Sequence, residues 1–303
     1  MKKVMITGAL GFIGFHLTEF LLNEGVEVVG IDGRIDPTRV SEYKMKEMYF
    51  IRNSNYRQVD SRLQDCSLEK EVEECDTVFH LASPHGEKRA SHMIQEGVST
   101  TKKLLEVCEG KVLVYLSSIE IFGRRYGNIT ERTPINPVTS DGRVKAEEEA
   151  VINTVDRNTT VKIIRVPLVY GPWQPVHYVF QDFFINGTLM KAYETEGERY
   201  HFDSLYVKDV CQAMYQTAVR IEGSETINLS SGREGEWQNG VEWCIGEKLN
   251  RKKRLRCAIS NKDCVSKVDF TNLTPIHKGL DQQRDHVEKM MLIDPAIYLG
   301  RSE

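Results

Sequence analysis

Three glycines near the start of the sequence, Gly8, Gly11 and Gly14, are spaced as GxxGxxG. An apolar run at residues 4–6 is typical of a strand, and residues 12–22 continue at helical spacing. The glycines therefore lie on a strand-to-helix turn, where backbone N–H groups approach the pyrophosphate of a dinucleotide. We expect Gly8 to permit the tight turn, Gly11 to admit the phosphates and Gly14 to let the helix pack close to the strand.

Phe12 and Ile13 open the helix and are expected to bind the cofactor as well. Asp32 ends a second apolar run about 20 residues beyond the glycines, where the dinucleotide fingerprint has an acidic residue. Its carboxylate accepts hydrogen bonds from the adenosine ribose and repels a 2′-phosphate, so the sequence favours NAD over NADP. Arg34 lies close enough to Asp32 to leave NADP as an alternative.

A second group of reactive side chains lies in two short segments. The first carries Ser118 and Glu120, and the second carries Asp141 and Lys145 at the start of an acid-rich helical stretch. Both segments are expected at the carboxyl ends of strands, where open α/β sheets bind ligands. Hydroxyl, carboxylate and ammonium groups in such a place are suited to moving protons.

The elements that position these residues alternate between strand and helix. Strands are predicted at residues 77–82, 111–116, 161–165, 205–210 and 226–229, and helices at 64–75, 91–108 and 141–155, with a polar segment at 36–56. Leu81 and Ala82 end a buried strand and are expected to contact the cofactor, with residues 83–86 as a loop over it. This alternation predicts an α/β fold, a Rossmann doubly wound parallel sheet with a smaller C-terminal substrate lobe.

The alternation loosens after residue 171, where glycine, aromatic and polar residues dominate. We therefore predict that residues 1–171 form an NAD-binding domain, with a return segment at about 203–230. Residues 172–202 and 231–303 are assigned to the substrate-binding lobe.

The composition is that of an ordinary globular protein. The 303 residues are 40% hydrophobic and 28% charged, with a net charge of −4 and a pI near 6.1. This balance predicts no nucleic-acid or membrane partner, and the one basic run, residues 251–254, is short. The seven cysteines are scattered without CxxC spacing, which argues for a reducing compartment and against a metal site. No signal peptide is recognised and no apolar run reaches the roughly 18 residues of a membrane span, so a cytoplasmic protein is expected.

Several of these segments resemble one known family. The GxxGxxG turn, residues 77–82 (the family's V-F-H-L-A-A), residues 117–123 (S-S-x-x-V-Y-G) and residues 137–145 (P-x-S-x-Y-G-x-S-K) resemble the extended short-chain dehydrogenase/reductases, in the NAD-dependent epimerase/dehydratase branch that modifies nucleotide sugars. The resemblance covers roughly residues 1–230, and residues 232–303 show no motif.

The resemblance implies a role for each reactive side chain. Lys145 matches the lysine that hydrogen-bonds the nicotinamide ribose and lowers the pKa of the catalytic base. Ser118 falls where family members hydrogen-bond the reacting hydroxyl. Glu120 falls where the sugar 4,6-dehydratases move the C5 proton of the sugar.

Asp141 stands where the family has its catalytic tyrosine. A carboxylate beside Lys145 can act as a base, but it is shorter than a phenol and would need a water molecule or a displaced substrate. The alternative is that Asp141 caps the helix or places charge in its first turn. Tyr126 and Tyr170 are further candidates to replace the tyrosine.

Other positions also depart from the family pattern. Ile119 replaces the aspartate that protonates the departing C6 hydroxyl in the dehydratases, so ordinary dehydration is disfavoured. Gly97 and Leu168 replace asparagines of the family, and Phe202 replaces an arginine.

These features predict an enzyme that acts on a nucleotide-linked hexose or hexosamine, with UDP favoured, and that recycles NAD. Hydride leaves C4, the ketone acidifies C5, and Glu120 handles the C5 proton before hydride returns. The outcome is either 5-epimerisation or conversion of a 5,6-unsaturated sugar to a 4-keto-6-deoxy sugar, as in the bacterial pseudaminic-acid route. The replaced tyrosine also resembles a 5,6-dehydratase of tunicamycin biosynthesis.

Two alternatives remain open. A nucleotide-sugar 4-ketoreductase would consume NADH, and a catalytically silent NAD-binding sensor or scaffold would explain the loss of the tyrosine. Retention of Lys145, Ser118 and Glu120 argues against the sensor. The resemblance also implies a homodimer, which the helices near 91–108 and 141–156 can form.

Overall fold

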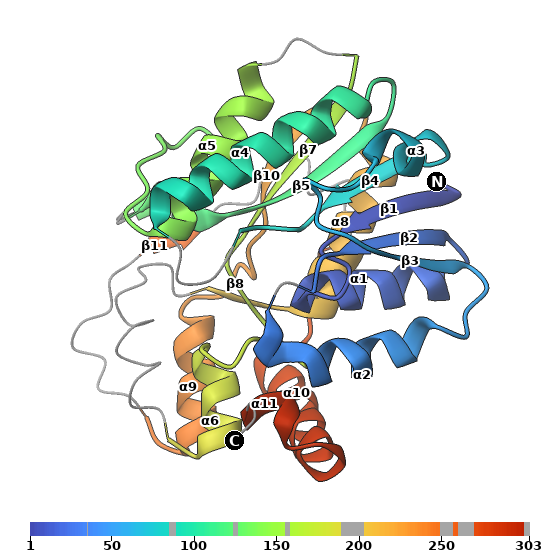
Figure 1. Ribbon diagram of the computed structural model, residues 1–303. Helices are drawn as coiled ribbons and strands as arrows, with labels where there is room; N and C mark the ends of the chain where they lie inside the picture. The colour runs from blue at the N-terminus through green and yellow to red at the C-terminus, as the bar shows by residue number, and fades with distance from the viewer. Residues whose placement is uncertain are drawn as a thin grey trace.

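The computed structural model describes residues 1–34, 36–84, 89–123, 127–154, 158–188, 203–248, 257–259 and 270–299, with the backbone alone for 257–259. Its centre is a parallel sheet of seven strands in the order β10-β7-β5-β4-β1-β2-β3 (Figure 1). The strands are β1 (Lys3–Thr7), β2 (Glu27–Asp32), β3 (Tyr56–Asp60), β4 (Thr77–His80), β5 (Val112–Ser118), β7 (Thr160–Val166) and β10 (Glu225–Asn228). The order runs outward from β1 in both directions, so the predicted doubly wound Rossmann sheet is confirmed.

Helices cover both faces of this sheet. They are α1 (Phe12–Asn23), α2 (Val40–Phe50), α3 (Leu68–Glu73), α4 (Ala90–Val107), α5 (Ser140–Thr154) and α8 (Val207–Arg220). Helices α4 and α5 pack side by side on one face, and α1 packs against α8 on the other (Figure 1). Successive strand residues serve opposite faces, because Val4 and Ile6 join the core under α1 while Met5 joins the core under α4.

A smaller group of elements lies beyond the carboxyl ends of the strands. Helices α6 (Val179–Asn186), α9 (Glu236–Ile245) and α10 (Ile276–Ile293) pack on one another. Two short parallel pairs accompany them, β8 (Leu168–Tyr170) with β9 (Ser204–Tyr206) and β6 (Gly127–Ile129) with β11 (Cys257–Ile259). The short helix α11 (Ala296–Leu299) packs on α2. The division of the chain into the domains predicted above remains a prediction.

Two predictions about elements were incomplete and a third was wrong. The segment 36–56 is not merely polar, because it contains a 3-10 turn (Pro37–Arg39), α2 and the first residue of β3. The short helix predicted over 64–75 is present but shorter, as α3. The predicted return at 205–210 is the end of β9, which pairs with β8 outside the large sheet, and the start of α8; only β10 rejoins the sheet. Tyr126, Phe202, residues 85–86 and the basic run 251–254 lie outside the described residues.

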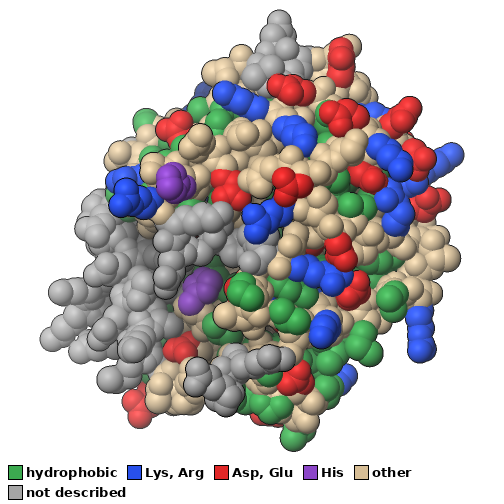
Figure 2. Space-filling model, viewed as in Figure 1, with side chains coloured by type: hydrophobic (Ala, Val, Ile, Leu, Met, Phe, Trp, Pro, Cys, Tyr) green, Lys and Arg blue, Asp and Glu red, His purple; other side chains and the backbone are tan. Residues whose placement is uncertain are grey.

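The surface carries both signs of charge. On the face seen in Figure 2, acidic and basic side chains are interspersed rather than gathered by sign. Among the described residues, no helix combines the length and the apolar character needed to cross a bilayer.

Candidate active site

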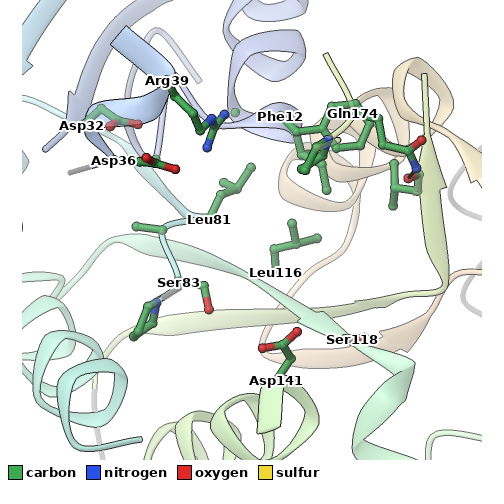
Figure 3. A pocket seen from close by; sticks show the side chains of 18 of the residues that line it. Phe12, Asp32, Asp36, Arg39, Leu81, Ser83, Leu116, Ser118, Asp141 and Gln174 are labelled. Atoms are coloured by element: carbon green, nitrogen blue, oxygen red, sulfur yellow. Dashed lines mark hydrogen bonds between the residues drawn. The ribbon is translucent and has the colours of Figure 1, made fainter. Parts of the chain in front are cut away.

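A pocket of about 880 Å³ opens at the carboxyl ends of the strands. Its lining includes the glycine-rich turn, Asp32, Leu81, Ala82, Ser118, Glu120, Asp141 and Lys145, so these predicted cofactor-binding and catalytic residues lie in one cavity. Figure 3 shows Asp32 at one end and Ser118 and Asp141 at the other, with Leu81 and Leu116 between them. The pocket therefore has a nucleotide end and a reaction end.

The backbone of the glycine-rich turn lies so close to neighbouring backbone atoms that side chains would clash there. Gly8 has a φ of 74°, and a Cβ there would lie 2.9 Å from the backbone nitrogen of Ala82. A Cβ at Gly14 would lie 2.0 Å from the carbonyl oxygen of Gly8. No side chain caps the N-terminus of α1 and no acidic residue stands in its first turn. Its open N–H groups and positive dipole end fit a pyrophosphate, as expected for a dinucleotide.

The acidic residue of the fingerprint lies where the sequence predicted. The carboxylate of Asp32 accepts hydrogen bonds from the N–H of Leu10 at 3.1 Å and of Arg34 at 3.0 Å. The Arg34 guanidinium pairs with Glu47 at 2.6 Å and with Asp60 at 2.9 Å, and it does not line the pocket. Two carboxylates therefore neutralise Arg34, and the structure gives it no part in binding a 2′-phosphate.

A buried ion cluster under the turn was missed from the sequence. Lys46, fully buried on α2, donates to the carbonyl of Leu10 at 3.0 Å and to the Glu42 carboxylate at 2.5 Å. Arg39 donates twice to the same carboxylate, at 2.8 and 2.6 Å. Burial alone would raise the pKa of Glu42, but Lys46 and Arg39 outweigh burial and lower that pKa to about 2. The cluster fixes the turn from below.

At the reaction end, Glu120 is held by a hydroxyl. Thr139 donates to the Glu120 carboxylate at 2.6 Å and accepts a hydrogen bond from the N–H of Gly142 at 3.0 Å. Ser118 caps the short 3-10 turn at Ile119–Phe122 by accepting from the N–H of Glu120 at 3.1 Å. Thr139 was not chosen from the sequence, although a threonine before an acidic helix start is a capping signal.

Asp141 is not the cap of α5, because Thr139 accepts the backbone hydrogen bond there. Asp141 lies in the first turn of the helix and faces the pocket (Figure 3). Lys145 follows one turn later on the same side. The structure therefore places Asp141 as a first-turn charge of α5 and not as its cap. Its role as a catalytic base remains a prediction.

Lys145 is held by two groups that the sequence analysis did not single out. Its ammonium lies 3.3 Å from the Glu148 carboxylate and 4.7 Å from the centre of the Tyr115 ring. The hydroxyl of Tyr115 donates to the same carboxylate. The spacing of Lys145 and Glu148, three residues apart on a helix, was the available signal.

Of the two tyrosines expected as substitutes for the catalytic tyrosine, Tyr126 lies outside the described residues and Tyr170 does not reach the pocket. Tyr170 is 1% exposed and packs against Phe180 and Tyr206 in the core rather than lining the pocket. Burial raises its pKa further above the usual range. Tyr178 and Tyr43 do line the pocket, but neither was predicted.

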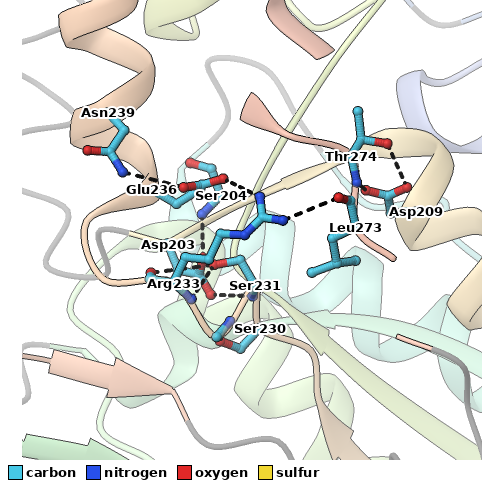
Figure 4. A network of polar contacts seen from close by, with 11 residues as sticks. Asp203, Ser204, Asp209, Ser230, Ser231, Arg233, Glu236, Asn239, Leu273 and Thr274 are labelled. Atoms are coloured by element: carbon cyan, nitrogen blue, oxygen red, sulfur yellow. Dashed lines mark hydrogen bonds and ion pairs between the residues drawn. The ribbon is translucent and has the colours of Figure 1, made fainter. Parts of the chain in front are cut away.

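The far wall of the pocket comes from later parts of the chain, including Gln174, Tyr178, Trp237 and residues 297–299. A polar network stabilises this region (Figure 4). Asp203 accepts from the N–H groups of Ser204 at 2.8 Å and Ser231 at 2.9 Å, while Asp209 holds Thr274 through two hydrogen bonds of 2.8 and 3.0 Å. Burial raises the pKa of Asp203.

Fold and site together define a dinucleotide-binding α/β protein with a polar reaction centre at one end of its pocket. The model of the NAD dependent epimerase/dehydratase family matches residues 4–230. The chain belongs to this family, whose members are NAD-dependent enzymes, so the predicted family and the predicted cofactor are confirmed.

Individual relatives agree with this assignment. The chain is 30% identical over 188 residues to an uncharacterised UDP-glucose epimerase, YtcB, of Bacillus subtilis, and the match covers 57% of this chain and 58% of that relative. The crystal structure of UDP-glucuronic acid 4-epimerase from Bacillus cereus with NAD is 21% identical, with a TM-score of 0.79 over 95% of this chain and 99% of that chain. The NDP-hexosamine 5,6-dehydratase TunA of tunicamycin biosynthesis is 18% identical, with a TM-score of 0.76 over 97% of this chain and 100% of that chain. At these identities the two structures show a shared fold.

Proposed function

We propose that this protein modifies a nucleotide-linked hexose or hexosamine, with UDP as the nucleotide, by hydride removal at C4, proton transfer at C5 and return of the hydride to the sugar. One observation carries the proposal: the Glu120 carboxylate, oriented by Thr139, lies in the same pocket as the glycine-rich turn and Lys145. A pocket with one carboxylate for C5 and an ammonium for the ribose has the groups that such a reaction needs.

When bound, NAD would accept hydride from C4 and later supply hydride, to C4 in 5-epimerisation or to C6 of a 5,6-unsaturated sugar. Gly8, Gly11, Gly14 and the N–H groups of Phe12 and Ile13 hold its pyrophosphate in this proposal, and Asp32 holds its adenosine ribose. Leu81 and Ala82 line the wall between the two ends of the pocket. All of them belong to the lining of one cavity.

At the sugar, Lys145 binds the nicotinamide ribose and Ser118 hydrogen-bonds the C4 oxygen. Asp141, one helical turn before Lys145, accepts the C4 hydroxyl proton through a water molecule, because its side chain is shorter than the tyrosine of the family. Glu120 then removes the acidified C5 proton or returns one to C5. No carboxyl group stands beside Glu120 at Ile119 to protonate a leaving C6 hydroxyl.

This arrangement favours 5-epimerisation, or reduction of a 5,6-unsaturated sugar at C6 with a proton delivered to C5. The second reaction is the step of the bacterial pseudaminic-acid route catalysed by the enzyme Pal, and the departures from the family pattern at Ile119 and Asp141 support it. The alternative 4-ketoreductase would require added NADH. A silent sensor would need neither Glu120 nor its hydrogen bond from Thr139.

The test is proton exchange at C5. The purified protein is incubated in heavy water with UDP-sugars, including 5,6-unsaturated ones, without added reductant, and deuterium at C5 is followed by NMR. We expect uptake by the wild type, no uptake by Glu120→Gln, and normal uptake by the control Glu109→Gln, which changes an exposed carboxylate. Uptake by Glu120→Gln at the wild-type rate would remove Glu120 from the mechanism.

The proposal extends to a homodimer in a reducing, cytoplasmic setting. Helices α4 and α5 lie side by side on the outer face of the sheet, where a second copy can add its own pair (Figure 1). Among the described residues, Cys66, Cys75 and Cys211 are buried thiols outside any disulfide, which supports a reducing compartment. Light scattering on the purified protein measures the oligomeric state, and a monomeric mass would refute the dimer.

A further inference from the structure

Glu148 is a carboxylate in the pocket that takes no part in the proposed reaction. It lies on α5 three residues after Lys145, it lines the pocket, and its side chain is only 1% exposed. A buried carboxylate is costly unless hydrogen bonds and a counter-charge compensate it. The groups that contact the Glu148 carboxylate therefore indicate its role.

Glu148 and Tyr115 enclose the Lys145 ammonium. One carboxylate oxygen lies 3.3 Å from Nζ of Lys145 and also accepts the hydroxyl of Tyr115. The ring of the same tyrosine faces the ammonium at 4.7 Å. Lys145 is thus held by a charge and by an aromatic face, in a position fixed from two directions.

A chain of hydrogen bonds ends on the other oxygen of Glu148. Thr7 accepts the N–H groups of Leu81 and Ala82, each at 3.2 Å, so its own hydroxyl hydrogen points to Nδ1 of His80 at 2.8 Å. Burial lowers the pKa of His80 to about 4, so the ring is neutral and its Nε2–H donates onward.

Thr101 receives that hydrogen bond at 3.4 Å and lies 3.4 Å from Oε1 of Glu148, to which it donates. Every link in this chain is a donor directed toward the carboxylate. The arrangement stabilises Glu148 as an anion beside Lys145.

Position 97 makes room for this carboxylate. A Cβ on Gly97 would lie 2.7 Å from Oε1 of Glu148. Any larger residue at position 97 would have to displace the Glu148 side chain. The small residue on α4 and the acidic residue on α5 are therefore matched.

We propose that Glu148 is a positioning residue that holds Lys145 and cancels its charge beside the nicotinamide, so that the site retains the oxidised cofactor. The inference rests on the proposed function, in which Lys145 contacts the nicotinamide ribose. The oxidised ring carries a positive charge and the reduced ring does not. An unbalanced Lys145 would favour the reduced form, and a recycled cofactor must instead return to the oxidised form.

The test compares the affinities for NAD⁺ and NADH. Two unit charges within about 10 Å at an effective dielectric constant of about 20 change a binding constant by about tenfold. In cofactor-free protein at neutral pH, we expect Glu148→Gln to raise the ratio Kd(NAD⁺)/Kd(NADH) by about tenfold, measured by titration calorimetry. The control Glu147→Gln removes an exposed carboxylate on the same helix and should leave the ratio unchanged.

A general loosening of the site would weaken both forms of the cofactor equally and leave the ratio unchanged. A folded Glu148→Gln variant with the wild-type ratio therefore refutes the proposal. If that variant does not fold, Gly97→Ala replaces it, because the added methyl clashes with Oε1 of Glu148 and disturbs the placement of the carboxylate beside Lys145. A raised ratio supports the proposal and an unchanged one overturns it. Failure of the proposed function is distinct, since the wild type would then show no C5 exchange whatever the ratio is.

Discussion

Replacing Lys46 with methionine tests how the glycine-rich turn is supported. The fall in the pKa of Glu42 from 4.5 to about 2 corresponds to about 3 kcal/mol of stability at neutral pH, which is lost as the pH falls from about 4.5 toward 2. Lys46 and Arg39 share this effect, and Arg39 keeps its two hydrogen bonds to Glu42 in the variant. We therefore expect a loss of about 2–3 kcal/mol, below the range for an unpartnered buried charge.

For a chain of this size, that loss lowers the Tm by about 5 °C. Calorimetry on cofactor-free protein measures it, and Lys44→Met, which changes an exposed lysine of the same helix, should leave the Tm within about 1 °C. Because Lys46 also contacts the carbonyl of Leu10 in the turn, NAD should bind more weakly to Lys46→Met. If both the Tm and the NAD affinity match the wild type, the buried cluster does not support the turn and the reasoning fails.

Three further predictions concern the hydroxyl at the reaction end, the choice of cofactor and the response to acid. Thr139→Val should slow C5 exchange about tenfold by releasing Glu120 and cost about 1 kcal/mol through the lost cap, seen by NMR and by denaturant unfolding; an unchanged rate would contradict the orienting role. Asp32→Asn should lower the ratio of the NAD affinity to the NADP affinity about tenfold in binding titrations, and an unaltered ratio would mean that this carboxylate does not face the ribose. Burial lowers the pKa of His286 to about 4, so the unfolded chain binds the extra proton and stability falls as the pH drops from about 6.5 to 4. His286→Phe should flatten that fall in unfolding curves, and an equally steep fall would assign it to other groups.

Much of the large sheet follows from local patterns. The apolar runs before Gly8 and before Asp32 predict β1 and β2 because a strand buried on both faces needs apolar residues throughout. The regular alternation also predicts α4 and α5 to within a residue or two of their observed ends. The cofactor-binding residues could be predicted because the backbone of the turn requires glycine at these positions.

The parts that were missed are polar residues that the fold buries. Sequence patterns treat lysine and glutamate as exposed, so α2, with Lys46 and Glu42 facing inward, reads as a polar segment. Glu148 lies between two other glutamates, and its neighbour Glu149 is buried for a different reason, since it pairs with Arg165 at 2.6 Å. Helical spacing brings both Glu148 and Glu149 near Lys145, and tertiary contacts decide between them, because Arg165 holds Glu149 and leaves Glu148 beside Lys145.

The pocket wall formed by residues 297–299 has a consequence for how the protein folds. These residues and the glycine-rich turn come from opposite ends of the described chain, yet they line the same cavity. Contacts between such distant segments form late, after the local strand–helix units. NAD held between them would therefore bind the finished fold and not its precursors. Added NAD should therefore slow unfolding of the protein and leave its rate of folding almost unchanged.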